Sequence, residues 1–291
     1  MGAIRMQTIC FLPLLVANAT AWAAGPSTAF GRAEELYQRA DYRAAVSMLL
    51  ALPTKTAAAY ALAGKAYYLD GDFRNATNYL EKAVIEDPRN SEYHDWLGKA
   101  YGRRAEEASF VTAFSYAKKT HHFFEKAAAL DPNNLEALGD LFEYYLQAPA
   151  IVGGGVEKAE NLALSIGRLN QPEYHYALAR LAEKRQDLPK VEQELRTAMK
   201  LAPGEIGRVI GLARFLYKQG CYEESEELFR RADQIAPDSP KLVFARAAAY
   251  VDARRNLEQA RALLRRYAEL PITPDDPPRS ESARLLLKAS R

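Results

Sequence analysis

Two segments of this chain repeat the same pattern of small, aromatic and turn-forming residues, and this self-similarity restricts the fold more than any other feature. In residues 57–90 the landmarks are Tyr60, Ala63, Gly64, Tyr67, Gly71, Phe73, Ala76, Leu80, Ala83 and Pro88. In residues 206–239 they are Val209, Leu212, Ala213, Leu216, Gly220, Tyr222, Ser225, Phe229, Ala232 and Pro237, each displaced by the same 149 positions. A period of roughly 20 to 50 residues is the signature of a repeat architecture, in which each unit stacks on its neighbours.

Each landmark has a physical reason to recur in a pair of antiparallel helices. Small residues such as Gly64, Ala83 and Ala213 allow two helices to approach closely, and the bulky landmarks fill the space between them. Gly71 and Gly220 stand where the first helix needs a left-handed residue to end. Prolines stop the second helix, and they are Pro88, Pro132, Pro203, Pro237 and Pro271. These stretches do not alternate with period two, so we expect no strands.

The landmarks resemble the tetratricopeptide repeat (TPR), a helix–turn–helix unit of about 34 residues. This resemblance implies an all-α, right-handed superhelical solenoid over residues 24–278, with a final helix in residues 279–291 that caps the last repeat. We expect about seven repeats, which lie near residues 27–55, 57–90, 91–134, 135–171, 172–205, 206–239 and 240–272. Residues 148–155 read Ala-Pro-Ala-Ile-Val-Gly-Gly-Gly, and exported bacterial TPR proteins carry a similar A-P-x-x-x-G-G-G segment.

The N-terminal residues have the features of a cleaved signal peptide. Arg5 precedes an apolar run over residues 9–17, and Ala21-Trp22-Ala23 provides a small-residue cleavage site. The apolar run is shorter than the roughly 20 residues that span a bilayer. We therefore predict a signal peptide over residues 1–23 and a periplasmic or secreted mature protein. Cys221 is then the sole mature cysteine, so packing alone must hold the fold.

Charge and motifs exclude several classes of function. The 39 Lys and Arg residues nearly balance the 37 Asp and Glu residues, which argues against a general nucleic-acid binder. The adjacent His121 and His122 would point about 100° apart on a helix, so they make a poor chelating pair. We expect His94 and His175 to pack in the core. We find no hydrolase or metalloprotease motif, and we predict no catalytic residue, no cofactor and no metal site.

Two departures from the repeat leave alternatives open. The glycines at 153–155 precede a helix and could cradle an anion, but an extended inter-helix loop explains them better. The third repeat carries ten extra residues, because Gly98 to Ala127 spans 29 positions against 19 from Gly64 to Ala83. Phe110 and Phe114 share one helix face in this insertion. That face could contact a partner, although we expect it to fold back onto the solenoid.

The resemblance also predicts a binding surface. Positions 9 and 13 of the first helix in each repeat line the concave face of TPR superhelices. They hold Lys65, Lys99, Arg180 and Arg214 at position 9 and Arg39, Arg103, Lys184 and Lys218 at position 13, with Tyr68, Tyr176 and Tyr217 beside them. Like-charged i,i+4 pairs cost a few tenths of a kcal/mol in an isolated helix. Because three such pairs recur on one face, we expect an opposite charge to arrive there.

These observations favour a non-enzymatic protein–protein interaction scaffold or adaptor of the cell envelope, which binds an acidic peptide or protein surface in its groove. The alternative is a binder of a polyanionic envelope glycan or lipid headgroup through the same basic residues. An accessory factor of a hydrolase, acting through the glycine-rich loop, is a weaker third class because no nucleophile–base pair accompanies it.

Overall fold

The computed structural model describes residues 28–290, which contain fifteen α-helices and one short 3-10 turn. The helices are α1 (Ala29–Gln38), α2 (Tyr42–Leu50), α3 (Ala57–Leu69), α4 (Phe73–Glu86), α5 (Ser91–Glu107), α6 (Phe110–Leu130), α7 (Leu135–Gln147), α8 (Val156–Leu169), α9 (Gln171–Lys184), α10 (Leu188–Leu201), α11 (Ile206–Lys218), α12 (Tyr222–Ile235), α13 (Pro240–Asp252), α14 (Leu257–Glu269) and α15 (Arg279–Ala289), with η1 (Ala150–Val152) between α7 and α8. The predicted signal peptide lies outside the described residues.

The ends of the helices lie where the turn-forming residues predicted them. Gly71 and Gly220 follow α3 and α11 with φ of +87° and +85°, the left-handed geometry that favours glycine. The five helix-stopping prolines each stand two residues beyond the last residue of a second helix. At the other ends, side chains such as Asn90 and Asn134 accept hydrogen bonds from the first-turn amides of α5 and α7.

Small residues set the distance between the two helices of a hairpin. A Cβ atom on Gly64 would lie 2.5 Å from Cγ of Leu80, and one on Gly98 would lie 2.5 Å from Cδ1 of Phe124. Leu80 and Phe229 are both fully buried. The predicted role of Gly64 as a close-approach residue is therefore confirmed, and Gly98 has the same role.

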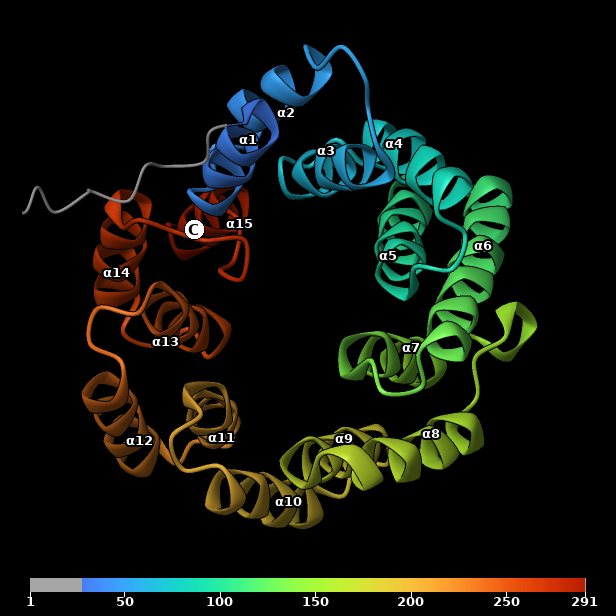
Figure 1. The fold of residues 1–291 in the computed structure, drawn as a ribbon. Helices are drawn as coiled ribbons and strands as arrows, with labels where there is room; N and C mark the ends of the chain where they lie inside the picture. Colours follow the sequence, from blue (N-terminus) through green and yellow to red (C-terminus); the bar gives the residue numbers. More distant parts are fainter. Residues whose placement is uncertain (1–27, 291) are drawn as a thin grey trace, which may run out of the picture.

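The hairpins form a ring with an open centre (Figure 1). The first helices, from α3 to α13, line the inner side, and the second helices, from α4 to α14, lie outside them. The predicted all-α solenoid is confirmed. The final helix α15 packs on α13 and α14, where Leu285 and Leu286 contact the core cluster, so it caps the last repeat.

The two ends of the solenoid meet and close the ring. Ala40, in the turn between α1 and α2, packs against an apolar cluster of Val243, Tyr267 and Ile272 from the C-terminal repeat. Figure 1 shows the N-terminal and C-terminal hairpins at the same part of the ring. The solenoid therefore completes a single circuit.

The insertion in the third repeat lengthens both of its helices. Helix α5 has 17 residues and α6 has 21, against 13 and 14 in α3 and α4. Phe110 and Val111 begin α6 at the tip of this long hairpin, and they are 90% and 80% exposed. The expectation that this face folds back onto the solenoid is wrong for Phe110, because the tip extends past the shorter neighbouring hairpins.

The glycine-rich loop is fixed by contacts within the chain. The amides of Gly153, Gly154 and Gly155 donate to the carbonyl oxygens of Ala150, Pro149 and Tyr145 at 2.9, 3.2 and 2.8 Å. Gly153 has φ of +100° and packs against the ring of His121 on α6. Since these amides already have acceptors, the loop serves to join the fourth hairpin to the third.

No helix within residues 28–290 combines the length and apolar character needed to cross a bilayer.

Candidate functional site: the concave face

Two adjoining hollows open on the inner side of the ring. The first, called the acidic hollow, has a volume of about 600 Å³ and is lined by Lys99, Leu135, Glu136, Gly139, Asp140, Phe142, Glu143, Gln147, Ile166, Glu173, Tyr176, Ala177 and Arg180. The second, called the basic hollow, has a volume of about 560 Å³ and is lined by Tyr176, Ala179, Arg180, Glu183, Val191, Leu195, Gly211, Arg214, Phe215, Lys218, Ala249, Asp252 and Ala253. Tyr176 and Arg180 belong to both, so the hollows form one continuous groove over α5 to α13.

A mid-helix glycine forms part of each hollow. A Cβ atom added to Gly139 on α7 or to Gly211 on α11 would meet no atom within 4 Å. Neither glycine has positive φ, so the backbone does not require glycine there. Packing within the described residues does not require glycine at these positions either. The absence of a side chain at each of them therefore leaves open space in the hollow.

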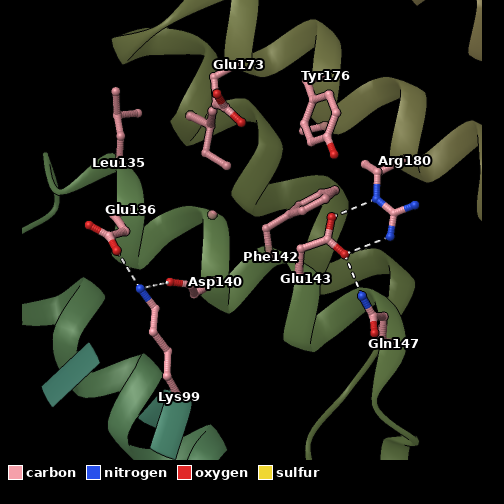
Figure 2. A pocket seen from close by; sticks show the side chains of 13 residues that line it. Lys99, Leu135, Glu136, Asp140, Phe142, Glu143, Gln147, Glu173, Tyr176 and Arg180 are labelled. Atoms are coloured by element: carbon pink, nitrogen blue, oxygen red, sulfur yellow. Dashed lines mark hydrogen bonds and ion pairs between the residues drawn. The ribbon is translucent and has the colours of Figure 1, made fainter. Parts of the chain in front are cut away.

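Lys99 lies at one end of the acidic hollow, among three carboxylates, and Figure 2 shows two of them, Glu136 and Asp140. The Nζ of Lys99 is 3.0 Å from Oδ2 of Asp95, 2.5 Å from Oε1 of Glu136 and 2.9 Å from Oδ2 of Asp140. Asp95 comes from the same helix, α5, whereas Glu136 and Asp140 come from α7. The ring of Trp96 covers the ammonium group at 4.7 Å.

This arrangement shifts the pKa values of the groups in it. Burial lowers the pKa of Lys99, but the three carboxylates outweigh burial and raise it above its ordinary value. Burial raises the pKa of Asp95 to about 7, and Asp140 and Glu136 add to the rise while Lys99 opposes it. Burial also raises the pKa of Asp140. The three carboxylates could hold a cation, and the Lys99 ammonium lies among them.

Arg180 on α9 separates the two hollows and is held by Glu143 on α7. Its Nε and Nη2 atoms donate to the two carboxylate oxygens of Glu143 at 2.8 and 2.9 Å, as Figure 2 shows. Glu183 forms a further ion pair with Arg180. Burial alone would raise the pKa of Glu143, but the hydrogen bonds from Arg180 lower it.

The cationic side chains in and near the basic hollow have fewer carboxylate partners than Lys99 and Arg180 have. Arg214 is exposed and has no carboxylate within ion-pair distance among residues 28–290. Lys218 is 72% exposed, and its Nζ lies 3.6 Å from Oε1 of Glu183. Lys184, at the end of α9, is exposed and likewise lacks an ion pair among the described residues. These three side chains are available to an anionic ligand.

The predicted residues on α3 and α5 form a separate network. Lys65 pairs with Glu92, and Arg103 pairs with Glu106 at 2.8 Å while lying over the ring of Phe73. Tyr68 packs edge-on against Phe73 and Trp96, with ring centroids 5.4 and 5.5 Å apart. These side chains therefore contact one another and lie outside the two hollows.

Tyr217 was expected to offer contact area in the groove, and the structure corrects this. Its side chain is 1% exposed, its ring packs against Tyr222 and Tyr250, and its hydroxyl accepts a hydrogen bond from Asn256. Position 12 of this repeat faces the next hairpin, where Tyr250 covers it. Tyr217 is therefore a core residue.

The concave face is less basic than the sequence predicted. The carboxylates that face Lys99 and Arg180 come from their own and from neighbouring helices of the same chain, so their like-charged pairs need no incoming anion. The sequence analysis did not identify Glu136 and Asp140. They are themselves a like-charged i,i+4 pair, so the search for such pairs that identified the basic residues could also have found them. In the Arg214–Lys218 pair, Arg214 has no ion pair among the described residues, and the ammonium of Lys218 lies 3.6 Å from Glu183, so this pair comes closest to the unpaired form that the sequence predicted.

The fold and the groove define a class of protein: an α-solenoid of helical hairpins with a ligand-sized concave face. The chain is similar in structure to a tetratricopeptide repeat protein from Parabacteroides merdae, with a TM-score of 0.58, 14% identity, and coverage of 90% of this chain and 98% of that chain. It is also similar to a thermophilic TPR protein of Thermus thermophilus, with a TM-score of 0.54, 20% identity, and coverage of 65% of this chain and 97% of that chain. The chain therefore has the tetratricopeptide repeat fold, and the resemblance drawn from its repeat landmarks is confirmed. No protein-family model and no curated protein sequence matches it.

Proposed function

We propose that this protein is a non-enzymatic scaffold or adaptor that binds a segment of a partner protein along its concave face. The observation that carries this proposal is the continuous groove formed by the two hollows, with volumes of about 600 and 560 Å³. A groove of this kind suits an extended peptide or an amphipathic helix.

The two open glycines support a close approach by the partner. Glycine within a helix costs about 1 kcal/mol relative to alanine. Gly139 and Gly211 carry this cost without any packing need among the described residues. Both would admit the backbone or a side chain of a ligand, since glycine is favoured where another chain comes close.

The basic hollow is the part of the groove that suits an acidic stretch of the partner. Arg214 and Lys218 face it, Lys184 lies nearby, and Phe215 and Tyr176 provide apolar contact area. A polyanionic glycan or lipid headgroup suits the groove less well, because Lys65, Lys99 and Arg180 are already paired with carboxylates.

The proposed place of action is the cell envelope. The support for it is the N-terminal sequence, with its short apolar run and Ala21-Trp22-Ala23 cleavage site. Within this proposal the protein works on exported proteins, without cofactor or nucleic acid.

Photo-crosslinking in intact cells tests the groove. A benzoylphenylalanine at Phe215 in the basic hollow should give a discrete crosslinked product, and the same group at the exposed Glu227 on the outer helix α12 should not. Gly211→Leu should abolish the product by filling the hollow, while CD and thermal unfolding show an intact fold. The charge-reversed variant Arg214→Glu should weaken it. A product of equal yield from both positions would exclude the groove as the binding surface.

A further inference from the structure

Negative charge exceeds positive charge at the Lys99 end of the acidic hollow. Three carboxylates, from Asp95, Glu136 and Asp140, lie within ion-pair distance of this single ammonium group. One oxygen from each lies within 4.8 Å of the others. At the other end of the hollow Glu143 is matched by Arg180 and Glu173 by Arg208, so the excess is local.

Asp95 provides a second and independent observation. Its side chain is almost fully buried, with 1% of the residue exposed, and it faces into this carboxylate cluster. Its Oδ2 pairs with Lys99, but its Oδ1 has no hydrogen-bond partner in the described part of the chain. A buried carboxyl with incomplete pairing is costly to ionise, so a further positive charge close to it would favour its ionised form.

The hollow can admit such a charge from outside. The side chains of Glu136 and Asp140 are 61% and 33% exposed, so both are partly open to solvent. Leu135, Phe142 and Tyr176 give the hollow an apolar lining, and Gly139 leaves space between them. An apolar lining with carboxylates at one end suits a side chain that has an aliphatic stem and a charged head.

We propose that the acidic hollow receives the ammonium or guanidinium group of a lysine or arginine carried by the partner segment. This inference rests on the proposed function and makes it more specific. Because the acidic and basic hollows share Tyr176 and Arg180, one segment spans both. The groove thus selects a segment of mixed charge, with a basic residue over α5 and α7 and acidic residues over α11.

A side chain fits this hollow better than a free metal ion does. Calcium and magnesium take about six or more oxygen ligands at roughly 2.0–2.6 Å. The Lys99 ammonium already lies between the three carboxylates, so an ion would have to displace it. An ammonium or guanidinium group that enters from the groove would pair with the partly exposed carboxylates of Glu136 and Asp140 and leave Lys99 in place.

Selection from a random 12-residue peptide library, displayed on phage, tests this pairing and requires no identified partner. The full-length protein is compared with Glu136→Gln and with the control Glu157→Gln, which removes the same charge from an exposed position on the outer helix α8. Peptides selected on the unchanged protein should be enriched in both basic and acidic residues. Glu136→Gln should lower their affinity by about fivefold, the upper range for one partly exposed ion pair, and Glu157→Gln should leave it unchanged.

The outcomes separate this inference from the proposed function. Selected peptides that are acidic without enriched lysine or arginine would overturn the inference and leave the groove proposal standing. Peptides that bind Gly139→Leu/Gly211→Leu as well as they bind the unchanged protein would overturn both. Calorimetric titration with calcium chloride gives a further check, because calcium binding that Glu136→Gln abolishes would identify a metal ion as the occupant instead.

Discussion

At the scale of a single residue, Asp95 beside the concave face makes the stability of the fold depend on pH. Burial raises its pKa to about 7, from an ordinary value of 3.8. The groups that face it are Lys99 on its own helix and Glu136 and Asp140 on α7. The pKa of Asp140 is raised as well, so it acts in the same direction. Between about pH 4 and pH 7 this carboxyl therefore holds more of its proton in the folded state than in the unfolded state, so its contribution to stability falls as pH rises through this window.

We predict that Asp95→Asn flattens this pH response. Relative to Asp95→Asn, the unchanged protein should lose free energy of unfolding from about pH 5 to about pH 7.5, because its buried carboxyl loses a proton in the folded state. The amide of asparagine has no proton to lose, so this contribution should be absent from the variant. Urea denaturation at several pH values measures it, and Asp233→Asn, at an exposed position on α12, is the matched control. Equal slopes for Asp95→Asn and the unchanged protein would contradict the prediction.

At the scale of the helices, identical residues have opposite roles according to what lies across from them. Gly98 on α5 and Gly211 on α11 are both mid-helix glycines. A Cβ atom on Gly98 would overlap the ring of Phe124, whereas one on Gly211 would meet nothing within 4 Å. Helix propensity favours alanine at both places, but packing forbids it at only one.

We predict that alanine at these two positions changes the free energy of unfolding in opposite directions. Gly98→Ala should lower the free energy of unfolding by about 1–3 kcal/mol, because Phe124 must move within a filled core. Gly211→Ala should raise it by up to about 1 kcal/mol, because alanine gains helix propensity and meets open space. Urea or thermal denaturation of both variants measures the difference. If both variants change the free energy of unfolding in the same direction, either the filled core at Gly98 or the open space at Gly211 has been assigned wrongly.

Helices were the most predictable level of this structure. The glycines and prolines of each repeat act through local backbone geometry, so Gly71 and Pro88 mark helix ends whatever surrounds them. The tip of α6 was not predictable in this way. Whether Phe110 is covered depends on how far the neighbouring hairpins extend, and repeat landmarks do not contain that information.

The charges of the groove depend on contacts between repeats, and for this reason they were only partly predictable. Lys99 pairs with Glu136 and Arg180 pairs with Glu143, each pair separated by 37 positions, which is close to one repeat. Considered one helix at a time, the inner face looked basic. Only when adjacent repeats are placed side by side does it divide into an acidic and a basic part.

The closed ring is a property of the whole molecule, and a small contact completes it. Ala40 has φ of +57°, an unfavourable conformation for alanine, and it packs against the cluster of Val243, Tyr267 and Ile272. The neighbouring Tyr42 has a pKa raised to about 12, first by burial and then by Asp276. The junction is therefore apolar at Ala40, with charges of both signs, Asp276 and Arg279, near Tyr42.

We predict that Ala40→Asp opens the ring and that Ala40→Asn does not. Asparagine and aspartate both tolerate positive φ better than alanine, so each relieves the backbone equally. Only aspartate places a charge against the apolar cluster, and partial burial of such a charge is unfavourable. Small-angle X-ray scattering should therefore give a larger radius of gyration and a larger maximum dimension for Ala40→Asp than for Ala40→Asn.

The comparison also determines how a partner reaches the groove. If the ring must open for a long segment to enter, Ala40→Asp should speed association with peptides selected on the unchanged protein and leave their contacts in the two hollows intact. If segments enter along the axis of the ring, both variants should associate at the rate of the unchanged protein. Equal scattering profiles for the two variants would mean that the contact at Ala40 does not hold the ends together, and closure would then have to come from the stacking of the hairpins themselves.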